Sequence, residues 1–478
     1  MKKFNKKKII AVDLDGTFIF TDVFHEQIIN LIKINPLYIF YFFFLIFKGK
    51  AKFKSYVAQK AKLNYKNLPY NIPLINWLKL QFKSGKKIIL CTGANKRTAQ
   101  KIAKLFNFFS MVISSDSKIN NIGINKRKIL TKKFGLKGYD YVGNDYDDLI
   151  IWQGANKSYL VNTDDKLKRL VLKKTAVGKI FNKKKNLLSE FFKLIRIHQW
   201  VKNFLIFVPV IAATEINNLS YMIKLFIAFC SMGFCASAIY ILNDLFDLES
   251  DREHPNKRYR PIPSGQISIK IALILIILLI CCSFIFSLYL NDHFRLGLFA
   301  YIFLSTIYTF YFKKIFLFDC VLLSILYLFR VVLGALVIEI EISNFLTIFS
   351  IFMFLSLALM KRHTELNIHN IKNYQSIPGR PYKNNNKLFL LIFGIVSGNV
   401  SSFILVLYLI NIKKTYLYSS PDLLWPIIPL VFLWINWIWY KSVQRKMYDD
   451  PILFAIKDKI SLMTVVFISL FYLIAQTF

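Results

Sequence analysis

The second half of the chain carries apolar segments long enough to cross a lipid bilayer. A spanning helix needs about 20 mainly apolar residues. Lipid offers no partner to free backbone polar groups, so such segments fold as helices. From about residue 203 these segments alternate with short polar connections. We therefore predict an all-α polytopic membrane domain with about nine transmembrane helices, near residues 203–218, 221–242, 268–290, 294–312, 316–338, 344–360, 387–410, 422–440 and 459–477.

The connections between these segments differ in charge. Those after the second, fourth, sixth and eighth segments carry most of the Lys and Arg, whereas EIEIS (339–343) is acidic. Because cytoplasmic loops are enriched in Lys and Arg, we expect an inner-membrane protein with a cytoplasmic amino terminus. An anionic membrane surface and phosphorylated substrates then explain the formal net charge of +37. No nucleic acid is expected as a partner, because the basic residues follow no nucleic-acid-binding motif.

A run of carboxylates follows the second apolar segment directly. In NDLFDLESDREHPNKRYRPIPSG (243–265), Asn243, Asp247 and Asp251 recur every four residues. On a helix this spacing places them on one face, about 6 Å apart along the axis. Such a face suits Mg²⁺ bridging a diphosphate; the simpler alternative is a solvated charged loop. Three basic side chains that follow can neutralise the remaining charge: Lys257, Arg258 and Arg260.

The amino-terminal third has a different pattern. Short apolar runs bounded by turn residues alternate with helical stretches, which is typical of a parallel α/β sheet. We predict a soluble α/β domain over residues 1–160, a basic linker over 161–195 and the membrane domain over 196–478. One apolar run, PLYIFYFFFLIF (36–47), is too short to span a bilayer. It is either an interfacial helix that docks the domain on the membrane or a helix packed on the α/β core.

Polar residues gather where the predicted strands end. Asp13 and Asp15 in AVDLDGT follow the first strand, Thr92 lies in LCTGANK, and VGNDYDD supplies further acids. Ligands of open parallel sheets bind at these carboxyl ends. A threonine can bind a phosphate oxygen, a lysine can neutralise a phosphoryl group, and the acids can hold Mg²⁺. The sequence therefore predicts a phosphate site in this domain.

In this order, these elements resemble the motifs of the haloacid dehalogenase (HAD) superfamily of phosphatases, over roughly residues 8–160. The resemblance implies an HAD-like Rossmannoid sheet in which Asp13 is the nucleophile and Asp15 the general acid/base. It also implies that Thr92 binds the phosphoryl group. Lys126 fits the family lysine best, and two alternatives are Lys118 and Lys128.

The resemblance further implies a Mg²⁺ site formed by Asp13, Asp15 and the acids of VGNDYDD. Asp148 matches the last metal-binding acid of the family. One position departs from the family pattern, which usually has Asp directly after the glycine, where this chain has Asn144 followed by Asp145. Either the metal binds more weakly or Asp145 substitutes. The alternative is a degenerate scaffold without activity.

The Asp-rich segment, a preceding helix on the cytoplasmic side and nine spans resemble the UbiA superfamily of intramembrane prenyltransferases, over about residues 190–478. Acids at such density in a membrane protein are costly and by default functional. In that family the first Asp-rich motif binds the Mg²⁺–diphosphate of an isoprenoid donor. Four residues match that motif: Asn243, Asp244, Asp247 and Asp251.

The second Asp-rich motif of the family is replaced by LALMKRHTELNIHN, in which Glu365 is the only acid and Lys361 and Arg362 dominate. A cationic pair there indicates direct binding of a phosphate. Three further stretches, RIHQWVKN, REHPNKRYRPIPSG and YTFYFKK followed by Arg330, are similar to the branch that contains decaprenyl-phosphate phosphoribosyltransferase. In that branch the donor is phosphoribosyl pyrophosphate and the acceptor is a polyprenyl phosphate.

Two phosphorylated substrates require many cations, and several are at hand: Lys202, Lys257, Arg258, Arg260, Lys313, Lys361 and Arg362. Three tyrosines can hydrogen-bond ribose or phosphate: Tyr308, Tyr311 and Tyr382. We therefore expect a Mg²⁺-dependent membrane phosphoribosyltransferase fused to a phosphatase that can remove the 5-phosphate of the product. Two alternatives remain. One is prenyl transfer from an isoprenyl diphosphate to an aromatic or lipid acceptor, and the other is a transporter or scaffold with a regulatory soluble domain.

Overall fold

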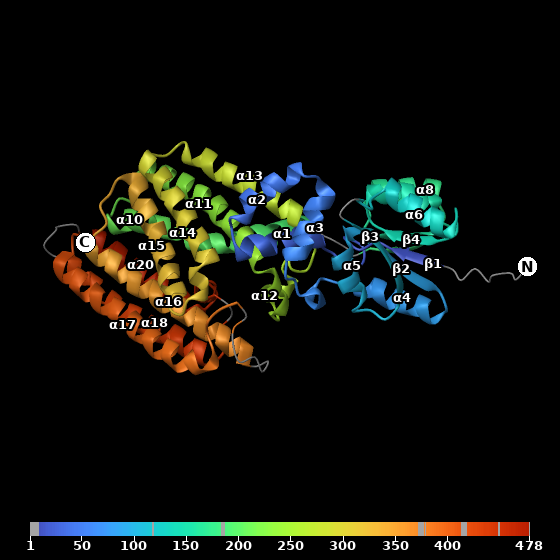
Figure 1. Ribbon diagram of the computed structural model, residues 1–478. Helices are drawn as coiled ribbons and strands as arrows, with labels where there is room; N and C mark the ends of the chain where they lie inside the picture. Colours follow the sequence, from blue (N-terminus) through green and yellow to red (C-terminus); the bar gives the residue numbers. More distant parts are fainter. Residues whose placement is uncertain are drawn as a thin grey trace, which may run out of the picture. The chain divides into compact units, whose positions relative to one another are not determined.

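The computed structural model describes residues 9–116, 119–182, 187–370, 377, 379–412, 418–447 and 450–477. The chain forms two compact units. Unit 1 comprises Met1–Leu194 and Asp244–Ile274, and unit 2 comprises Ile195–Asn243 and Leu275–Phe478. The Asp-rich segment after Asn243 therefore belongs to the same unit as the amino-terminal domain (Figure 1).

Unit 1 is built on a parallel sheet of six strands in the order β3-β2-β1-β4-β5-β6. Parallel neighbours need crossover connections, which the intervening helices supply. β1 (IIAV) is apolar throughout and β2 is apolar over residues 88–91, as expected for strands covered on both faces. The strands are β1 (Ile9–Val12), β2 (Lys87–Asn95), β3 (Phe109–Ser115), β4 (Asp140–Gly143), β5 (Ser158–Val161) and β6 (Val177–Phe181).

Helices cover both faces of the sheet. On one face, Val12 and Leu90 pack with residues of α4 (Ile72–Lys83) and α5 (Lys96–Ala103). On the other, Ala11 and Ile89 pack with residues of three helices. These are α6 (Ile124–Phe134), α7 (Leu149–Gly154) and α8 (Asp165–Lys174). The predicted parallel α/β fold is confirmed.

The sheet extends beyond the predicted boundary at residue 160. β5 pairs in parallel with β6, and α8 connects them, so both elements lie inside the segment 161–195 that we expected to be a linker. Helix α8 is mostly charged but buries Leu167 and Val171, which lie one turn apart on one face. The next helix, α9 (Leu187–Ile195), follows a stretch outside the described residues.

Three helices follow β1 before the chain returns to the sheet: α1 (Val23–Ile34), α2 (Tyr38–Phe47) and α3 (Lys50–Lys60). In α2, Phe42 and Leu45 are buried against residues of α1 and α3. Tyr38 is half-buried, and the other large side chains of α2 are between 42% and 76% exposed. The apolar run thus packs on neighbouring helices along one side and leaves the rest of its surface uncovered within this unit.

Within the described residues, nine helical segments are long and apolar enough to cross a membrane. The first runs over Leu188–Ala212, earlier than the predicted 203–218, and is interrupted by a 3₁₀ stretch at Ile197–Phe207. The chain is an integral multi-pass membrane protein. The other eight contain α11 (Leu219–Phe246), α13 (Ile269–Ser287), α14 (Asp292–Phe310), α15 (Phe318–Ile338), α16 (Asn344–Asn370), α17 (Lys387–Ile412), α18 (Ile427–Val443) and α20 (Lys459–Thr477).

Candidate active sites

The phosphate site predicted in unit 1 lies at the carboxyl ends of the central strands. Val12 of β1 is paired with Leu90 of β2 and Val142 of β4, so the residues that follow these three lie at the same edge of the sheet. Asp13 and Asp15 come next after β1. Gly16, with a φ of +74°, lets the chain turn where a Cβ would stand 2.4 Å from the Asn144 amide. The Thr17 hydroxyl donates to Oδ1 of Asn144 at 2.8 Å.

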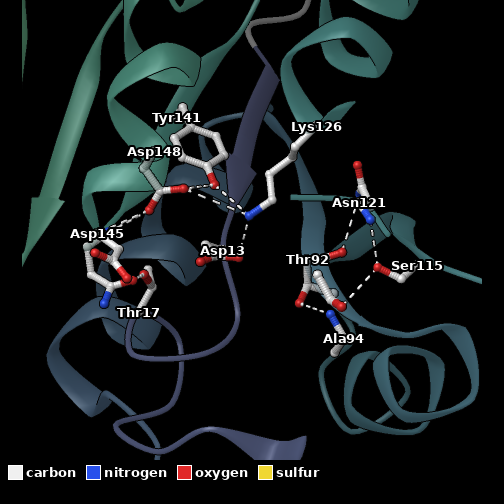
Figure 2. A network of polar contacts seen from close by, with 12 residues as sticks. Asp13, Thr17, Thr92, Ala94, Ser115, Asn121, Lys126, Tyr141, Asp145 and Asp148 are labelled. Atoms are coloured by element: carbon white, nitrogen blue, oxygen red, sulfur yellow. Dashed lines mark hydrogen bonds and ion pairs between the residues drawn. The ribbon is translucent and has the colours of Figure 1, made fainter. Parts of the chain in front are cut away.

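Lys126 lies at the centre of this site (Figure 2). Its Nζ is 2.8 Å from Oδ1 of Asp13, 3.8 Å from Oδ1 of Asp148 and 3.0 Å from the Tyr141 hydroxyl. The side chains of Lys126 and Asp148 are at most 5% exposed. The structure therefore brings together the predicted nucleophile, lysine and last acid. Lys128, the alternative lysine, is exposed on α6, and Lys118 lies outside the described residues.

Asp148 is held in place by its other contacts. Tyr141 donates its hydroxyl hydrogen to Oδ1 at 2.7 Å, and the backbone N–H groups of Asn144 and Asp145 donate to Oδ2 at 2.9 and 3.2 Å. Asp145, the proposed substitute acid, is exposed and accepts from the Tyr146 N–H at 2.6 Å. Asp148 is thus the acid of this loop that lies beside Lys126.

The two carboxylates after β1 are poorly solvated. Burial raises the pKa of Asp13 to about 6, against the opposing effect of Lys126. Burial, together with Asp22, also raises the pKa of Asp15 well above its usual value. Oδ1 of Asp15 accepts from the Val23 N–H at 2.9 Å, at the start of α1. Such shifts are typical of groups that act as nucleophile or as acid and base.

Thr92 lies on β2, two residues beyond Leu90, and is fully buried. Its Oγ1 accepts from the Ala94 N–H at 2.9 Å, and its carbonyl accepts from the Asn121 amide at 3.3 Å. Ser115 donates to the Gly93 carbonyl at 2.9 Å. Asn121 and Ser115 could not be found from the sequence, because they contact the backbone of Thr92 and Gly93 from other segments of the chain.

The donor chemistry of this site fits Mg²⁺, because hard carboxylate oxygens of Asp13 and Asp15 lie at the strand end in a setting that disfavours their charge. Among the described residues, no three His, Cys, Asp or Glu side chains lie close enough together to hold a metal ion by themselves. Metal binding would therefore involve oxygen atoms besides the carboxylates, from backbone, substrate or water.

The Asp-rich segment also belongs to unit 1. Its Arg260 guanidinium lies 3.1 Å from Oδ1 of Asp244 and 2.7 Å from Oδ2 of Asp251, so one cation bridges two acids. Burial nevertheless raises the pKa of Asp251 to about 6, and Asp244 and Asp247 contribute to the rise. This crowding of carboxylates is the property that suits a divalent cation.

The predicted ladder on one continuous helix is not what the structure has. Helix α11 ends at Phe246, and after Asp247 a separate short helix, α12 (Leu248–Glu253), begins. Asp244 on α11 and Asp251 on α12 share Arg260 instead. Asn243, in unit 2, accepts a hydrogen bond from the Thr309 hydroxyl. Asp247, with φ −99° and ψ 10°, is the single non-helical residue between the two helices.

The three predicted cations of this segment have different surroundings. Arg260 contacts the acids directly, and Lys257 opposes the rise in the Asp251 pKa, so its charge acts on that carboxylate. Arg258 is exposed, and its guanidinium stacks on the Tyr259 ring at 4.7 Å from the centroid. Arg260 and Lys257 therefore act on these carboxylates, whereas the Arg258 guanidinium lies against a tyrosine ring.

Unit 2 holds a second polar cluster, around Arg362. Its Nε lies 2.6 Å from Oδ2 of Asp319, and its Nη1 lies 2.5 Å from Oε2 of Glu365. Tyr308 receives hydrogen bonds from Arg362 at 3.3 Å and from Arg380 at 2.9 Å. Arg362 is therefore paired with two acids, not an unpaired phosphate ligand as the sequence suggested.

Other predicted residues meet at the same cluster or close to it in unit 2. The Lys313 carbonyl accepts from Arg380 at 3.3 Å, and Tyr382 donates to Asp319. The predicted cations Lys202 and Lys361 converge on one acid that was not predicted. Asp450 is 2.5 Å from Lys202 Nζ and 3.7 Å from Lys361 Nζ.

Asp319, Arg380 and Asp450 are thus residues that the sequence analysis missed. Asp319 is a fully buried acid at the start of α15, inside an otherwise apolar span. An ionisable residue in such a segment is rare and needs a partner. That signal was available from the sequence, whereas the identity of its partner was not.

Comparisons with known proteins agree with this architecture. The model of the UbiA prenyltransferase family matches residues 204–467. The uncharacterised protein y4nM of Sinorhizobium fredii is 31% identical over 461 residues, covering 96% of this chain and 89% of that protein. A decaprenyl-phosphate phosphoribosyltransferase of Corynebacterium glutamicum is 36% identical over 189 residues, which cover 39% of this chain and 57% of that protein.

Among solved structures, a UbiA homologue from Archaeoglobus fulgidus bound to DMAPP and Mg²⁺ covers 60% of this chain with 15% identity and a TM-score of 0.45. The family model spans more than half of the chain, and the match with y4nM runs through both units. On these grounds, this membrane protein belongs to the UbiA prenyltransferase family.

Proposed function

We propose that the chain transfers phosphoribose from phosphoribosyl pyrophosphate to a polyprenyl phosphate at the cytoplasmic side of the membrane. The observation that carries the proposal is the concentration of cations in unit 2. Lys202 and Lys361 share a single acid, and Arg362 and Arg380 both reach Tyr308. An acceptor that carries a phosphate needs such charges, whereas an aromatic acceptor does not.

The similarity to decaprenyl-phosphate phosphoribosyltransferases from Corynebacterium glutamicum and Mycolicibacterium smegmatis supports this choice of substrates. Those matches cover less than two thirds of either relative, so the substrates are part of the proposal. The bond between ribose C1 and the pyrophosphate oxygen breaks, and pyrophosphate leaves with the electron pair. An oxygen of the lipid phosphate then forms the new bond to C1.

Asp244 and Asp251, which share Arg260, would supply carboxylates to Mg²⁺, and the pyrophosphate and water would supply its other oxygen ligands; Asn243 and Asp247 flank this pair in the sequence. Bound there, the ion would withdraw negative charge from the pyrophosphate. Arg260, which bridges Asp244 and Asp251, and Lys257 would neutralise the leaving group. Glu365 and Asp319 orient Arg362 through the contacts described above.

The test uses the purified full chain with radiolabelled phosphoribosyl pyrophosphate and polyprenyl phosphate. Label should enter the lipid fraction in the presence of Mg²⁺, and Asp244→Asn should lower the rate by about a hundredfold or more, as for loss of one electrostatic contact in a transition state. Asp292→Asn, at an exposed ion pair of unit 2, is the matched control. Incorporation of label from isoprenyl diphosphate alone would contradict the proposal.

Prenyl transfer from an isoprenyl diphosphate is the second candidate. It is favoured by the pairing of Arg362 with Asp319 and Glu365, which leaves the cluster less positive than the sequence suggested. The same assay with labelled isoprenyl diphosphate and an aromatic acceptor measures it. Incorporation into that acceptor at a rate equal to or above that of phosphoribosyl transfer would establish it.

For unit 1 the proposed activity is phosphate-ester hydrolysis, with the 5-phosphate of the lipid-linked product as substrate. Asp13 would attack phosphorus and become an aspartyl-phosphate, while the alcohol leaves with a proton from Asp15. Water, losing a proton to Asp15, would then attack the same phosphorus, break its bond to Asp13 and release inorganic phosphate. Lys126 would neutralise the phosphoryl oxygens. The test is release of inorganic phosphate from the product by the wild type. Asp13→Asn should abolish this release and leave the lipid-linked phosphate intact.

A further inference from the structure

A buried ion pair joins the amino-terminal domain to the Asp-rich segment within unit 1. Nη1 and Nη2 of Arg252 lie 2.9 and 2.6 Å from the two carboxylate oxygens of Glu26, although the residues are 226 positions apart in the chain. Their side chains are 7% and 3% exposed. Arg252 also donates from Nε to the Pro263 carbonyl at 3.0 Å. This two-point geometry fixes both the position and the orientation of the guanidinium.

A second close approach lies beside it. Gly265 has a φ of +69°, and a Cβ there would stand 2.5 Å from the Phe20 Cβ and 2.7 Å from the Phe20 carbonyl oxygen. Only glycine allows the backbone after the Asp-rich segment to lie against the loop that follows Asp15. At the other end, the Asn67 amide donates to Glu253 at 2.9 Å, and the Asn64 N–H donates to Glu249 at 3.2 Å.

The residues that hold this segment are direct neighbours of its acids. Arg252 follows Asp251, whose carboxylate contacts Arg260. Helix α12 has six residues and the 3₁₀ turn after it has three. Helices this short are not stable by themselves, so their position depends on what they pack against. Within unit 1, that support comes from α1 and the loop around Phe20.

Glu26 has no part in the proposed phosphatase chemistry. It lies one turn into α1, the helix whose first N–H, that of Val23, donates to Asp15. Its burial is explained by Arg252, because a buried carboxylate requires a paired cation. We propose that Glu26 and Arg252 are positioning residues for the transferase: the amino-terminal domain holds the Asp-rich segment in the shape that binds the diphosphate. This inference rests on the proposed role of Asp244 and Asp251.

The amino-terminal domain then serves the transferase as a scaffold, independently of its own turnover. Breaking the pair should leave a buried charge and loosen the segment, although all of its acidic side chains are still present. We therefore expect lower affinity for the donor and for Mg²⁺, without loss of the groups that bind them.

The test compares Glu26→Gln, Arg252→Gln and the exchanged pair Glu26→Arg/Arg252→Glu in the full chain. Each single variant should raise KM for phosphoribosyl pyrophosphate and the half-saturating Mg²⁺ concentration by about tenfold, as loss of a residue that supports metal ligands does. The exchanged pair should recover at least part of this loss. His25→Gln, at the adjacent and more exposed position of α1, is the matched control and should change neither value.

Limited trypsin digestion gives a second readout that does not depend on activity. Cleavage after Lys257 or Arg258 should be faster in Glu26→Gln than in the wild type, because local opening exposes the segment. If Asp244→Asn abolishes transfer while Glu26→Gln alters neither KM nor proteolysis, the positioning role is wrong and the proposed function stands. If Asp244→Asn leaves transfer intact, the proposed function fails. Faster cleavage in Glu26→Gln would then still show that the Glu26–Arg252 pair holds the Asp-rich segment.

Discussion

Lys126 Nζ lies 2.8 Å from the Asp13 carboxylate, although 113 residues separate them in the sequence. The contact forms because β1 ends at Val12 and α6 starts near the ends of β2 and β4, above the same edge of the sheet. Both side chains are largely buried, and the lysine also reaches Asp148. A nucleophile, a cation and a fixed acid therefore meet where a parallel sheet binds its ligands.

Lys126→Met should lower phosphate release by about a hundredfold or more, because the developing charge on the phosphoryl oxygens loses the buried cation beside Asp13. Lys128→Met is the matched control, since Lys128 lies two residues away on an exposed part of α6. Its rate should stay within about twofold of the wild type, as for most surface substitutions. Equal losses in both variants would argue against the role of Lys126.

The rate of phosphate release should depend on pH through Asp13. Its pKa is raised to about 6 by burial, and only the ionised carboxylate is a nucleophile. The rate should therefore rise as the pH increases through about 6. Since Lys126 opposes this rise, Lys126→Met should move the acidic limb to higher pH, and added Mg²⁺ should move it to lower pH. Measurement of kcat/KM against pH at several Mg²⁺ concentrations checks the prediction; an acidic limb near 4 in all conditions would contradict it.

The same shift has a consequence for stability. The folded-state pKa of Asp13 is above its usual value of 3.8, so the folded state favours the protonated form. This contribution is fully present below the unfolded value and is lost as the pH rises through about 6. Asp13→Asn should therefore stabilise the chain near neutral pH while it abolishes the phosphatase reaction.

Much of the fold could be predicted because its signals are local. Apolar runs at strand length and at membrane-span length identified the parallel sheet and the membrane helices. The extension of the sheet by α8 and β6 could not be read in the same way. These elements are short and rich in lysine, and only a few side chains such as Leu167 and Val171 face the core. An exposed edge element of this kind resembles a linker in composition.

In the candidate sites, too, residues in local motifs could be predicted, whereas contacts between distant segments could not. Asp13, Lys126 and Asp148 could be located from motifs, because each lies at a defined place relative to a strand or helix. The partners of Arg362 and Lys202 could not, since Asp319 and Asp450 come from distant segments. Only the packing of the helices decides which acid meets which cation.

Asp450→Asn should destabilise unit 2. Asp450 and Lys202 are 6% and 5% exposed, and the pKa of Asp450 is lowered to about 2, mainly by Lys202 against the effect of burial. The substitution leaves Lys202 as a buried cation without its carboxylate, which costs about 3 kcal/mol. The midpoint of thermal unfolding in detergent should fall by several degrees. Asp292→Asn, at an ion pair whose acid is 84% exposed, should leave the midpoint unchanged.

Helix α2 should insert into the membrane surface. Its side chains Phe43 and Phe47 are 61% and 76% exposed, and lysines follow it at the start of α3. Such a helix combines apolar area for lipid chains with cations for anionic head groups. A photoactivatable phenylalanine analogue at position 43 of the full chain in liposomes should cross-link to phospholipid. The same analogue at Phe42, which is 6% exposed, should cross-link to protein, and at Leu80, 62% exposed on α4, to neither. Lipid adducts at Leu80 as abundant as those at Phe43 would show that α2 does not contact the membrane more than other exposed helices do.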